Sequence, residues 1–222
     1  MAELLVVTLA YTITGRDADV LTRVRLVADT VRNAPGLVNF RFYRSRGNDA
    51  YYLMLTTWDD DESWRRAQER HNPRQLLLGS AAGFLTVPPE QWLMRYLWGY
   101  SRPLASPILA AAHLAHIRKE QAAYAQLGWI EGLRQPTVQA PLAFSFLARG
   151  VHEESFPGGQ SATPPPDGAE EAPYHLGSVL LNLFSWASEH EREQFYADPN
   201  YQDINRFVSS TGTVRILPLE PM

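Results

Sequence analysis

The sequence contains one short pattern twice, YYLMLTTWDDDESW at Tyr51–Trp64 and VLLNLFSWASEHEREQFYADPNY at Val179–Tyr201. In each stretch a β-rich apolar run ends at a tryptophan, Trp58 or Trp186, and leads into polar residues typical of a helix start. A strand that runs into a helix at the same place in two parts of the chain indicates an internal repeat. We therefore expect two copies of one structural unit.

The residues around the first copy predict the order strand, helix, two strands, helices and strand. Valines recur at helical spacing from Val20 to Val31, and Pro35-Gly36 ends this helix. Asp61 and Asn72-Pro73 are expected to begin two helices after Trp58. The expected strands are Leu4–Thr12, Leu37–Ser45, Ala50–Trp58 and Gln91–Tyr100, the last with Trp92, Met94, Tyr96 and Trp98 on one face as sheet-to-sheet core.

The same order recurs in the second half, so the predicted fold class is α+β with two tandem ferredoxin-like βαββαβ repeats. We place the repeats at residues 1–103 and 104–222. The offset between matching residues grows by about 25 between Gly150 and Trp186, which places an insertion in one hairpin loop of the second repeat. This loop, at about 151–174, is rich in proline, glycine and acidic residues, a composition that favours disorder over a functional lid.

The composition excludes several classes of chemistry. The chain has 222 residues, a formal net charge of -4, 45% hydrophobic residues and no cysteine. Without cysteine there is no disulfide framework, cysteine nucleophile, thiolate zinc site or iron–sulfur cluster. Mild acidity and scattered arginines make nucleic acid a poor partner. No apolar stretch approaches the roughly 20 residues that span a bilayer, and Glu3 stands where a secretory signal needs a basic residue. We expect a cytoplasmic protein with no membrane partner.

Each repeat would have a four-stranded sheet with helices on one face, which leaves the other face in need of a partner. Together with the two tryptophan motifs, this arrangement resembles the antibiotic biosynthesis monooxygenase family, most members of which are homodimers that form an α+β barrel. The resemblance implies that the two halves of this chain pair in cis as a fused dimer. It also allows a further homo-oligomer of the fused chain.

Asn182 is the polar residue whose position in the sequence is most unusual. Side chains alternate along a strand, so Asn182 shares one face with Leu180, Phe184 and Trp186. A buried amide without a partner costs about 1–3 kcal/mol, so it must bond to protein, water or ligand. Two alternatives remain: the amide fixes a loop or helix end, or it donates into a cavity between the sheet and the helices.

The quinone-forming branch of the family oxygenates aromatic phenols without metal or flavin, and its spacing is similar to that of Asn182, Trp186 and Arg206. The resemblance assigns these three residues to catalysis and implies a cofactor-independent reaction. The tyrosine of that branch is replaced by Arg192, with Tyr196 one helical turn further on as a substitute. Phe184, Tyr196 and Trp58 are the expected substrate-binding residues. The first half keeps Trp58 but lacks the other motif residues, so only the second half resembles a complete site.

A second branch of the family binds and degrades haem, and this chain departs from its pattern. The positions of its helical histidine ligand hold Leu77 and Asn205, so haem is the less favoured alternative, with His71 or His190 as ligands in a shifted geometry. His113 and His116 are expected to point to opposite faces of one strand, which makes a poor metal pair. No metal-ligand spacing such as HExxH occurs, and no metal site is expected.

These features predict a cofactor-independent monooxygenase that acts with O2 on a small aromatic of the phenol or anthrone type. The substrate must form a delocalised anion, because triplet oxygen reacts slowly with ordinary closed-shell molecules. Asn182 and Arg206 would stabilise the charge, and Trp186 would form a wall of the site. The alternative is a small-molecule-binding protein of the same fold without catalysis.

Overall fold

A computed structural model of the chain describes residues 3–15, 17–47, 50–151 and 178–222. The expected βαββαβ order is present in both halves. Nearly all of the predicted insertion at 151–174 lies outside the described residues. The first half consists of β1 (Leu4–Tyr11), α1 (Asp17–Arg32), β2 (Leu37–Ser45), β3 (Tyr51–Trp58), α2 (Asp61–His71), α3 (Pro73–Ser80) and β4 (Glu90–Ser101). The second consists of β5 (Leu109–Ile117), α4 (Ala122–Leu133), α5 (Pro136–Gln139), β6 (Phe144–Gly150), β7 (Ser178–Trp186), α6 (Glu189–Ala197), α7 (Pro199–Thr211) and β8 (Gly212–Pro221).

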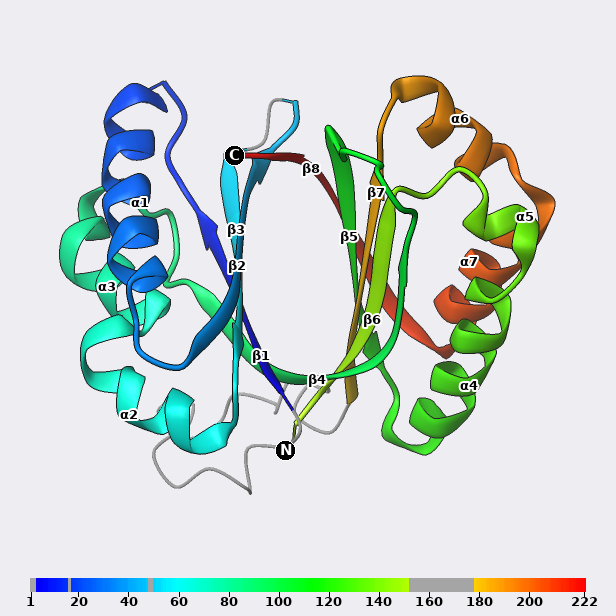
Figure 1. The fold of residues 1–222 in the computed structure, drawn as a ribbon, viewed down its shortest axis with the longest axis horizontal. Coiled ribbons are helices and arrows are strands. Elements are labelled where there is room, and N and C mark those ends of the chain that lie inside the picture. The colour runs from blue at the N-terminus through cyan, green and yellow to red at the C-terminus, as the bar shows by residue number, and fades with distance from the viewer. Residues whose placement is uncertain (1–2, 16, 48–49, 152–177) are drawn as a thin grey trace, which may run out of the picture.

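The eight strands form one closed barrel in the order β1-β3-β2-β8-β5-β7-β6-β4. Each repeat lends its last strand to the other: β4 pairs with β1 and with β6, and β8 pairs with β5 and with β2. The helices cover the two outer sides of the barrel, one set for each repeat (Figure 1). The expected pairing of the halves within one chain, as an α+β barrel, is confirmed.

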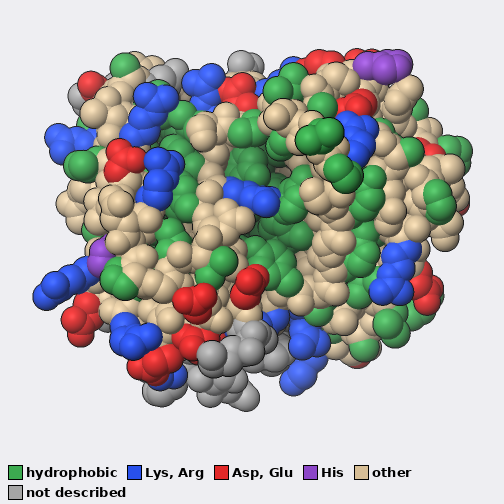
Figure 2. Space-filling model, in the orientation of Figure 1, with side chains coloured by type: hydrophobic (Ala, Val, Ile, Leu, Met, Phe, Trp, Pro, Cys, Tyr) green, Lys and Arg blue, Asp and Glu red, His purple; other side chains and the backbone are tan. Residues whose placement is uncertain are grey.

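Charged side chains of both signs are intermixed on the face shown in Figure 2. This distribution agrees with the small net charge of -4 and with the scatter of arginines along the sequence. None of the described helices has the length and apolar character needed to cross a membrane.

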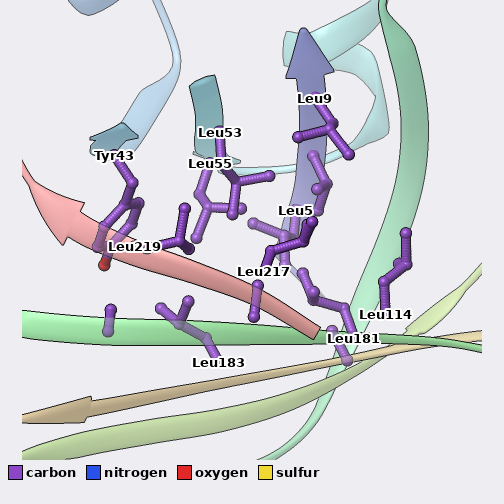
Figure 3. Packing of buried hydrophobic residues seen from close by; sticks show 14 of the residues in the cluster. Leu5, Leu9, Tyr43, Leu53, Leu55, Leu114, Leu181, Leu183, Leu217 and Leu219 are labelled. Atoms are coloured by element: carbon purple, nitrogen blue, oxygen red, sulfur yellow. The ribbon is translucent and has the colours of Figure 1, made fainter. Parts of the chain in front are cut away.

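The barrel interior is filled by leucines from both repeats. Alternate residues of β1 and β3 point inward, including Leu5 and Leu53, and meet Leu183 and Leu217 from β7 and β8 (Figure 3). All four side chains are buried. The interior is therefore a packed core shared by both repeats, as expected for two sheets that each have one uncovered face.

Two further layers of core lie between the barrel and its helices. In the first repeat the predicted valine stripe of α1 is buried, from Val20 to Val31, and Trp58 packs against Trp64 with ring centroids 5.3 Å apart. Two helix starts were predicted after Trp58. The cap of the first, α2, is Asp60 and not Asp61, and its side chain accepts from the Ser63 amide. Asn72 caps α3 as expected.

The prediction that Trp92, Met94, Tyr96 and Trp98 share one face is wrong at its last position. The pairing of β4 with β6 shifts register between Tyr96 and Trp98, which leaves Leu97 as an extra residue. Such a bulge reverses the alternation of the residues after it. Met94 lies in the barrel interior, whereas Trp98 packs against the helix-side core of the second repeat.

Candidate functional site

The second repeat places a group of aromatic and polar side chains between its sheet and its helices. Phe184 and Trp186 lie on the helix-facing side of β7 beside Asn182, and all three are fully buried. Side chains from β5, α6 and α7 complete the group. We call it the second-repeat cluster, consisting of His113, Asn182, Phe184, Trp186, Phe195, Tyr196 and Tyr201.

The rings of the cluster are in continuous contact. Trp186 lies 5.6 Å from Tyr196 and 5.3 Å from Phe195, measured between ring centroids. Tyr201 lies 5.3 Å from Tyr196 in an edge-on arrangement. The His113 ring meets Phe184 edge-on at 5.0 Å. The cluster thus surrounds its polar atoms with aromatic surface, which lowers the local dielectric and strengthens any hydrogen bond made there.

The side-chain amide of Asn182 is hydrogen-bonded through its oxygen but not through its nitrogen. Its Oδ1 accepts from the Ser145 hydroxyl at 3.2 Å, but its Nδ2 has no partner among the described residues. Asn182 stands directly opposite His113 in the pairing of β7 with β5, so both side chains project from adjacent positions on the same face. This arrangement does not decide whether the amide fixes a loop or helix end or donates into a cavity. It does place the unbonded N–H donor of Asn182 beside a histidine.

The indole nitrogen of Trp186 also lacks a described partner, unlike that of Trp58, its counterpart in the first repeat. The indole Nε1 of Trp58 donates to Thr56 Oγ1 at 3.0 Å, whereas the Nε1 of Trp186 has no described partner. The residue two positions before Trp186 is Phe184, which has no hydroxyl to accept this bond. Trp58 itself lies on the helix side of the first repeat and does not join the second-repeat cluster.

Buried polar atoms without partners are concentrated in this cluster. In the described parts of the chain five such side-chain atoms occur, and three of them are Asn182 Nδ2, Trp186 Nε1 and the Tyr201 hydroxyl oxygen. Each costs about 1–3 kcal/mol when left unpaired. The cluster is therefore a place where water or a ligand would gain hydrogen bonds.

Every titratable member of the cluster is uncharged near neutral pH. Burial lowers the pKa of His113 to about 3 and raises the pKa of Tyr196 to about 12. Burial, and then the neighbouring Tyr196, raise the pKa of Tyr201 far above its ordinary value. His113 Nε2 and the Tyr196 hydroxyl lie 3.4 Å apart, a long contact that leaves both groups able to bond elsewhere.

Arg206 does not reach the cluster, contrary to the expectation. Its side chain is 78% exposed and pairs with Asp203 at 3.2 Å. The buried residues of α7 include Ile204 and Val208, and a turn of about 100° per residue puts Arg206 about 160° away from both. The sequence spacing placed Arg206 on the right helix but on its solvent face.

Tyr196 does occupy the place expected for it as a substitute. It projects from α6 against Trp186, while Arg192 stays outside the cluster and pairs with Glu189 at 2.8 Å. Tyr196 is half-buried and is the member of the cluster closest to solvent. Access to the buried polar atoms would therefore begin at this ring.

Sequence reasoning missed His113, Ser145 and Tyr201 as neighbours of Asn182. The prediction that His113 and His116 point to opposite faces is correct, because His113 is buried against the helix layer while His116 is half exposed beside Arg215. The sequence of its strand could have indicated the position of His113. Ala111 and Ala115 lie on the same face as His113, and their small side chains leave room for the large rings around it.

Among the described residues, no group of donors matches a metal site or the ligand pattern of the haem-binding branch. No group of three or more His, Asp or Glu residues in the described chain is placed to hold a metal ion. Of the two positions where the haem-binding branch has its ligand, Leu77 is buried in the first-repeat core and Asn205 lies on α7 with an amide in place of imidazole. His190 bonds to Gln194 on the exposed side of α6. These residues do not fit haem.

Comparison with known proteins confirms the family resemblance over the first repeat. Residues 4–72, which lie within the first repeat, match the model of the antibiotic biosynthesis monooxygenase family. A search of curated proteins finds no match.

Solved structures share the whole architecture. An anthrone oxidase-like protein has a TM-score of 0.73 at 12% identity, with 100% of this chain and 92% of that chain covered. A protein from Fusobacterium nucleatum subsp. nucleatum, described as a candidate monooxygenase, has a TM-score of 0.66 at 5% identity, with 99% and 92% covered. A major regulator of staphylococcal pathogenesis has a TM-score of 0.53 at 10% identity, with 99% of both chains covered. At these identities the likeness shows the fold.

Proposed function

We propose that this protein oxidises a small phenol or anthrone-type aromatic with O2, without metal or flavin, in the second-repeat cluster. The observation that carries the proposal is the set of three buried donors without partners, on Asn182, Trp186 and Tyr201, within one aromatic layer. A flat aromatic that carries one or two hydroxyl or carbonyl oxygens supplies acceptors for such donors and can stack on the aromatic rings of the cluster. The structural likeness to an anthrone oxidase-like protein supports the same substrate class.

His113 is the proposed proton acceptor. A histidine whose pKa lies at about 3 is neutral near pH 7, so its free nitrogen can take the proton of a bound phenol or anthrone. By itself the depressed pKa makes it a weak base. The anion formed next to it stabilises the imidazolium, so proton transfer and binding of the anion support each other.

The donors then act on the oxygen that carries the negative charge. Asn182 Nδ2 and Trp186 Nε1 each supply an N–H at a fixed place, and the Tyr201 hydroxyl remains protonated because burial raises its pKa. Donors fixed in a water-poor site stabilise developing charge without reorganisation. With Arg206 in solvent, the fixed part of this stabilisation comes from neutral dipoles, and the imidazolium formed on His113 adds to it.

The overall reaction balances without a cofactor. The ring carbon para to the oxygen function gains one oxygen atom of O2 as a new carbonyl, and two hydrogens leave the substrate. In an anthrone both hydrogens come from that carbon, and in a phenol one comes from that carbon and one from the O–H group. The second oxygen atom leaves as water with those two hydrogens. The substrate supplies all four electrons that reduce the two oxygen atoms, so no reductant besides the electron-rich anion is needed. Tyr196 must move aside to admit the ring, since it is the half-buried member of the cluster.

An oxygen electrode with anthrone as substrate tests the proposal. Removing one fixed donor by Asn182→Leu is expected to lower the rate about 100-fold. Tyr201→Phe removes a hydroxyl that bonds to nothing in the described protein, so a loss of rate in this variant cannot come from a broken internal bond. Wild-type protein that takes up no oxygen above the uncatalysed rate would refute the activity.

The two tryptophans provide a matched control. Trp58 and Trp186 are both fully buried at the ends of equivalent strands, so Trp→Phe removes the same atoms at both places. Trp186→Phe is expected to lower oxygen uptake, whereas Trp58→Phe leaves it unchanged. Equal activities of the two variants, with both folded by circular dichroism, would refute the site.

The exposed position of Arg206 favours a second candidate, a small-molecule-binding protein without catalysis. The cluster has donors but no cation among the described residues that would favour a deprotonated substrate. Under this alternative anthrone binds and quenches Trp186 fluorescence, yet oxygen uptake stays at the uncatalysed rate. Fluorescence and oxygen uptake measured on the same sample separate the two candidates.

A further inference from the structure

A second pocket, lined by other side chains than those of the second-repeat cluster, lies where the two repeats meet. It has a volume of about 370 Å³, within the range of small-molecule sites. Figure 2 shows a hollow between the two halves with hydrophobic side chains at its bottom and a basic side chain across it. We call it the seam pocket; its lining includes Arg32, Arg41, Tyr43 and Phe40 from α1 and β2, Ala105 from the β4–β5 connection, and Phe144 from β6.

The seam pocket combines aromatic walls with positive charge. The Arg41 guanidinium lies 3.7 Å from the centroid of the Phe144 ring, across the boundary between the repeats. The Arg32 guanidinium lies 5.2 Å from the Phe40 ring centroid. Rings and guanidinium groups held in this way offer both a stacking surface and donors for an anion.

The charge of Arg41 is not balanced by a carboxylate in the described chain. No Asp or Glu lines the pocket, and no described acidic group lies within ion-pair distance of Arg41. The comparable half-buried arginine of β8, Arg215, makes two bonds to Glu90 at 2.8 and 3.0 Å. A half-buried cation without a counter-ion is costly, and an anionic ligand would remove that cost.

Tyr43 adds a polar group on the floor of the pocket. It is buried on the same face of β2 as Arg41, which donates a side-chain hydrogen bond to it. Burial raises the pKa of Tyr43, so the hydroxyl stays protonated and can donate. A guanidinium and a hydroxyl side by side match the two oxygens of one carboxylate.

We propose that the seam pocket binds a planar aromatic monocarboxylate of one to three rings. The carboxylate would bond to Arg41 and Tyr43, and the ring would pack on Phe144 and Phe40. The site exists only in the closed barrel, because its walls come from both repeats. It is independent of the oxidation proposed for the second-repeat cluster.

Titration calorimetry with 2-naphthoate and the neutral isostere 2-naphthamide tests the proposal. Wild-type protein is expected to bind naphthoate about tenfold more tightly than the amide, the value of one charge-assisted bond. Arg41→Gln should abolish this preference, and Arg41→Lys should restore part of it. Arg44→Gln is the matched control, since Arg44 lies on the same strand, pairs with Glu220 and does not line the pocket.

Amide chemical shifts locate the bound probe. Addition of naphthoate should shift the signals of Tyr43, Ala105 and Phe144 and leave those of Tyr196 and Tyr201, on the helices of the second repeat, unchanged. Equal affinity for acid and amide in wild-type protein, or an equal loss in Arg44→Gln and Arg41→Gln, overturns the proposal. Shifts confined to the second-repeat cluster overturn it as well. If Arg41→Gln does not fold, Phe144→Leu is the second variant, expected to weaken both probes and to keep the preference for the acid.

Discussion

The replacement His113→Gln is expected to make the protein more resistant to mild acid. His113 is only 2% exposed, and burial lowers its pKa from 6.5 to about 3. In the unfolded chain the same imidazole takes up a proton near pH 6.5, whereas in the folded chain it stays neutral until about pH 3. Between these values the unfolded state binds more protons, so the free energy of unfolding falls as the pH falls.

The size of this effect follows from the two pKa values. From pH 7 to pH 5 the His113 contribution lowers the free energy of unfolding by about 2 kcal/mol, most of which is lost below pH 6.5. Glutamine keeps a polar side chain but does not titrate, so this part of the pH dependence should disappear. His116, whose pKa is also lowered, first by burial and then by Arg215, leaves a smaller dependence of the same sign.

Urea unfolding followed by tryptophan fluorescence at pH 7 and pH 5 measures the difference. The comparison uses the change with pH within each variant, so any overall destabilisation by His113→Gln cancels. Trp58→Phe, a buried substitution that changes no titratable group, is the control and should keep the wild-type pH dependence. If His113→Gln loses as much stability as wild type between these pH values, the imidazole is not held neutral by burial and the reasoning is wrong.

Three further substitutions test separate features. Tyr201→Phe removes a buried hydroxyl without a described partner and should raise the free energy of unfolding by about 1 kcal/mol in a urea titration; a loss of stability would mean that the hydroxyl is bonded. Gly132→Ala places a methyl group onto the Ile204 side chain where α4 packs on α7, and should cost about 1–3 kcal/mol despite the better helix propensity of alanine. Ile204→Ala removes both clashing atoms, so it should cost less in the Gly132→Ala background than in wild type. Leu104 is exposed with a φ of 62°, so Leu104→Asn should raise the melting temperature by relieving about 1 kcal/mol of backbone strain, and an unchanged melting temperature would contradict this.

Periodicity and repetition were sufficient to predict the two repeats. The pattern that ends at Trp58 recurs at Trp186, and two sheets with one uncovered face each were expected to pair, whereas the closed barrel was implied by the family resemblance. The position of Trp98 could not be predicted in this way. A bulge at Leu97 depends on how β4 meets β6 from the other repeat, and no local residue pattern specifies that contact.

The candidate site was predictable only in part, for similar reasons. Strand alternation correctly grouped Asn182 with Trp186, because the period of a strand leaves two faces to choose from. A helix offers a continuous range of directions, and spacing alone did not show that Arg206 points to solvent. His113 comes from a distant strand, and its place opposite Asn182 depends on the pairing register of β5 and β7.

Because both sides of the barrel belong to one polypeptide, they can change by mutation independently. In an assembly of two identical chains, a substitution on one side appears on the other as well, so both sides must tolerate it. Here Thr56 satisfies the indole of Trp58, while Phe184 leaves the indole of Trp186 without a described partner. One half can thus keep the indole of its strand tryptophan bonded internally while the other gathers unsatisfied polar groups for ligand chemistry. The fused chain carries one such specialised side per barrel.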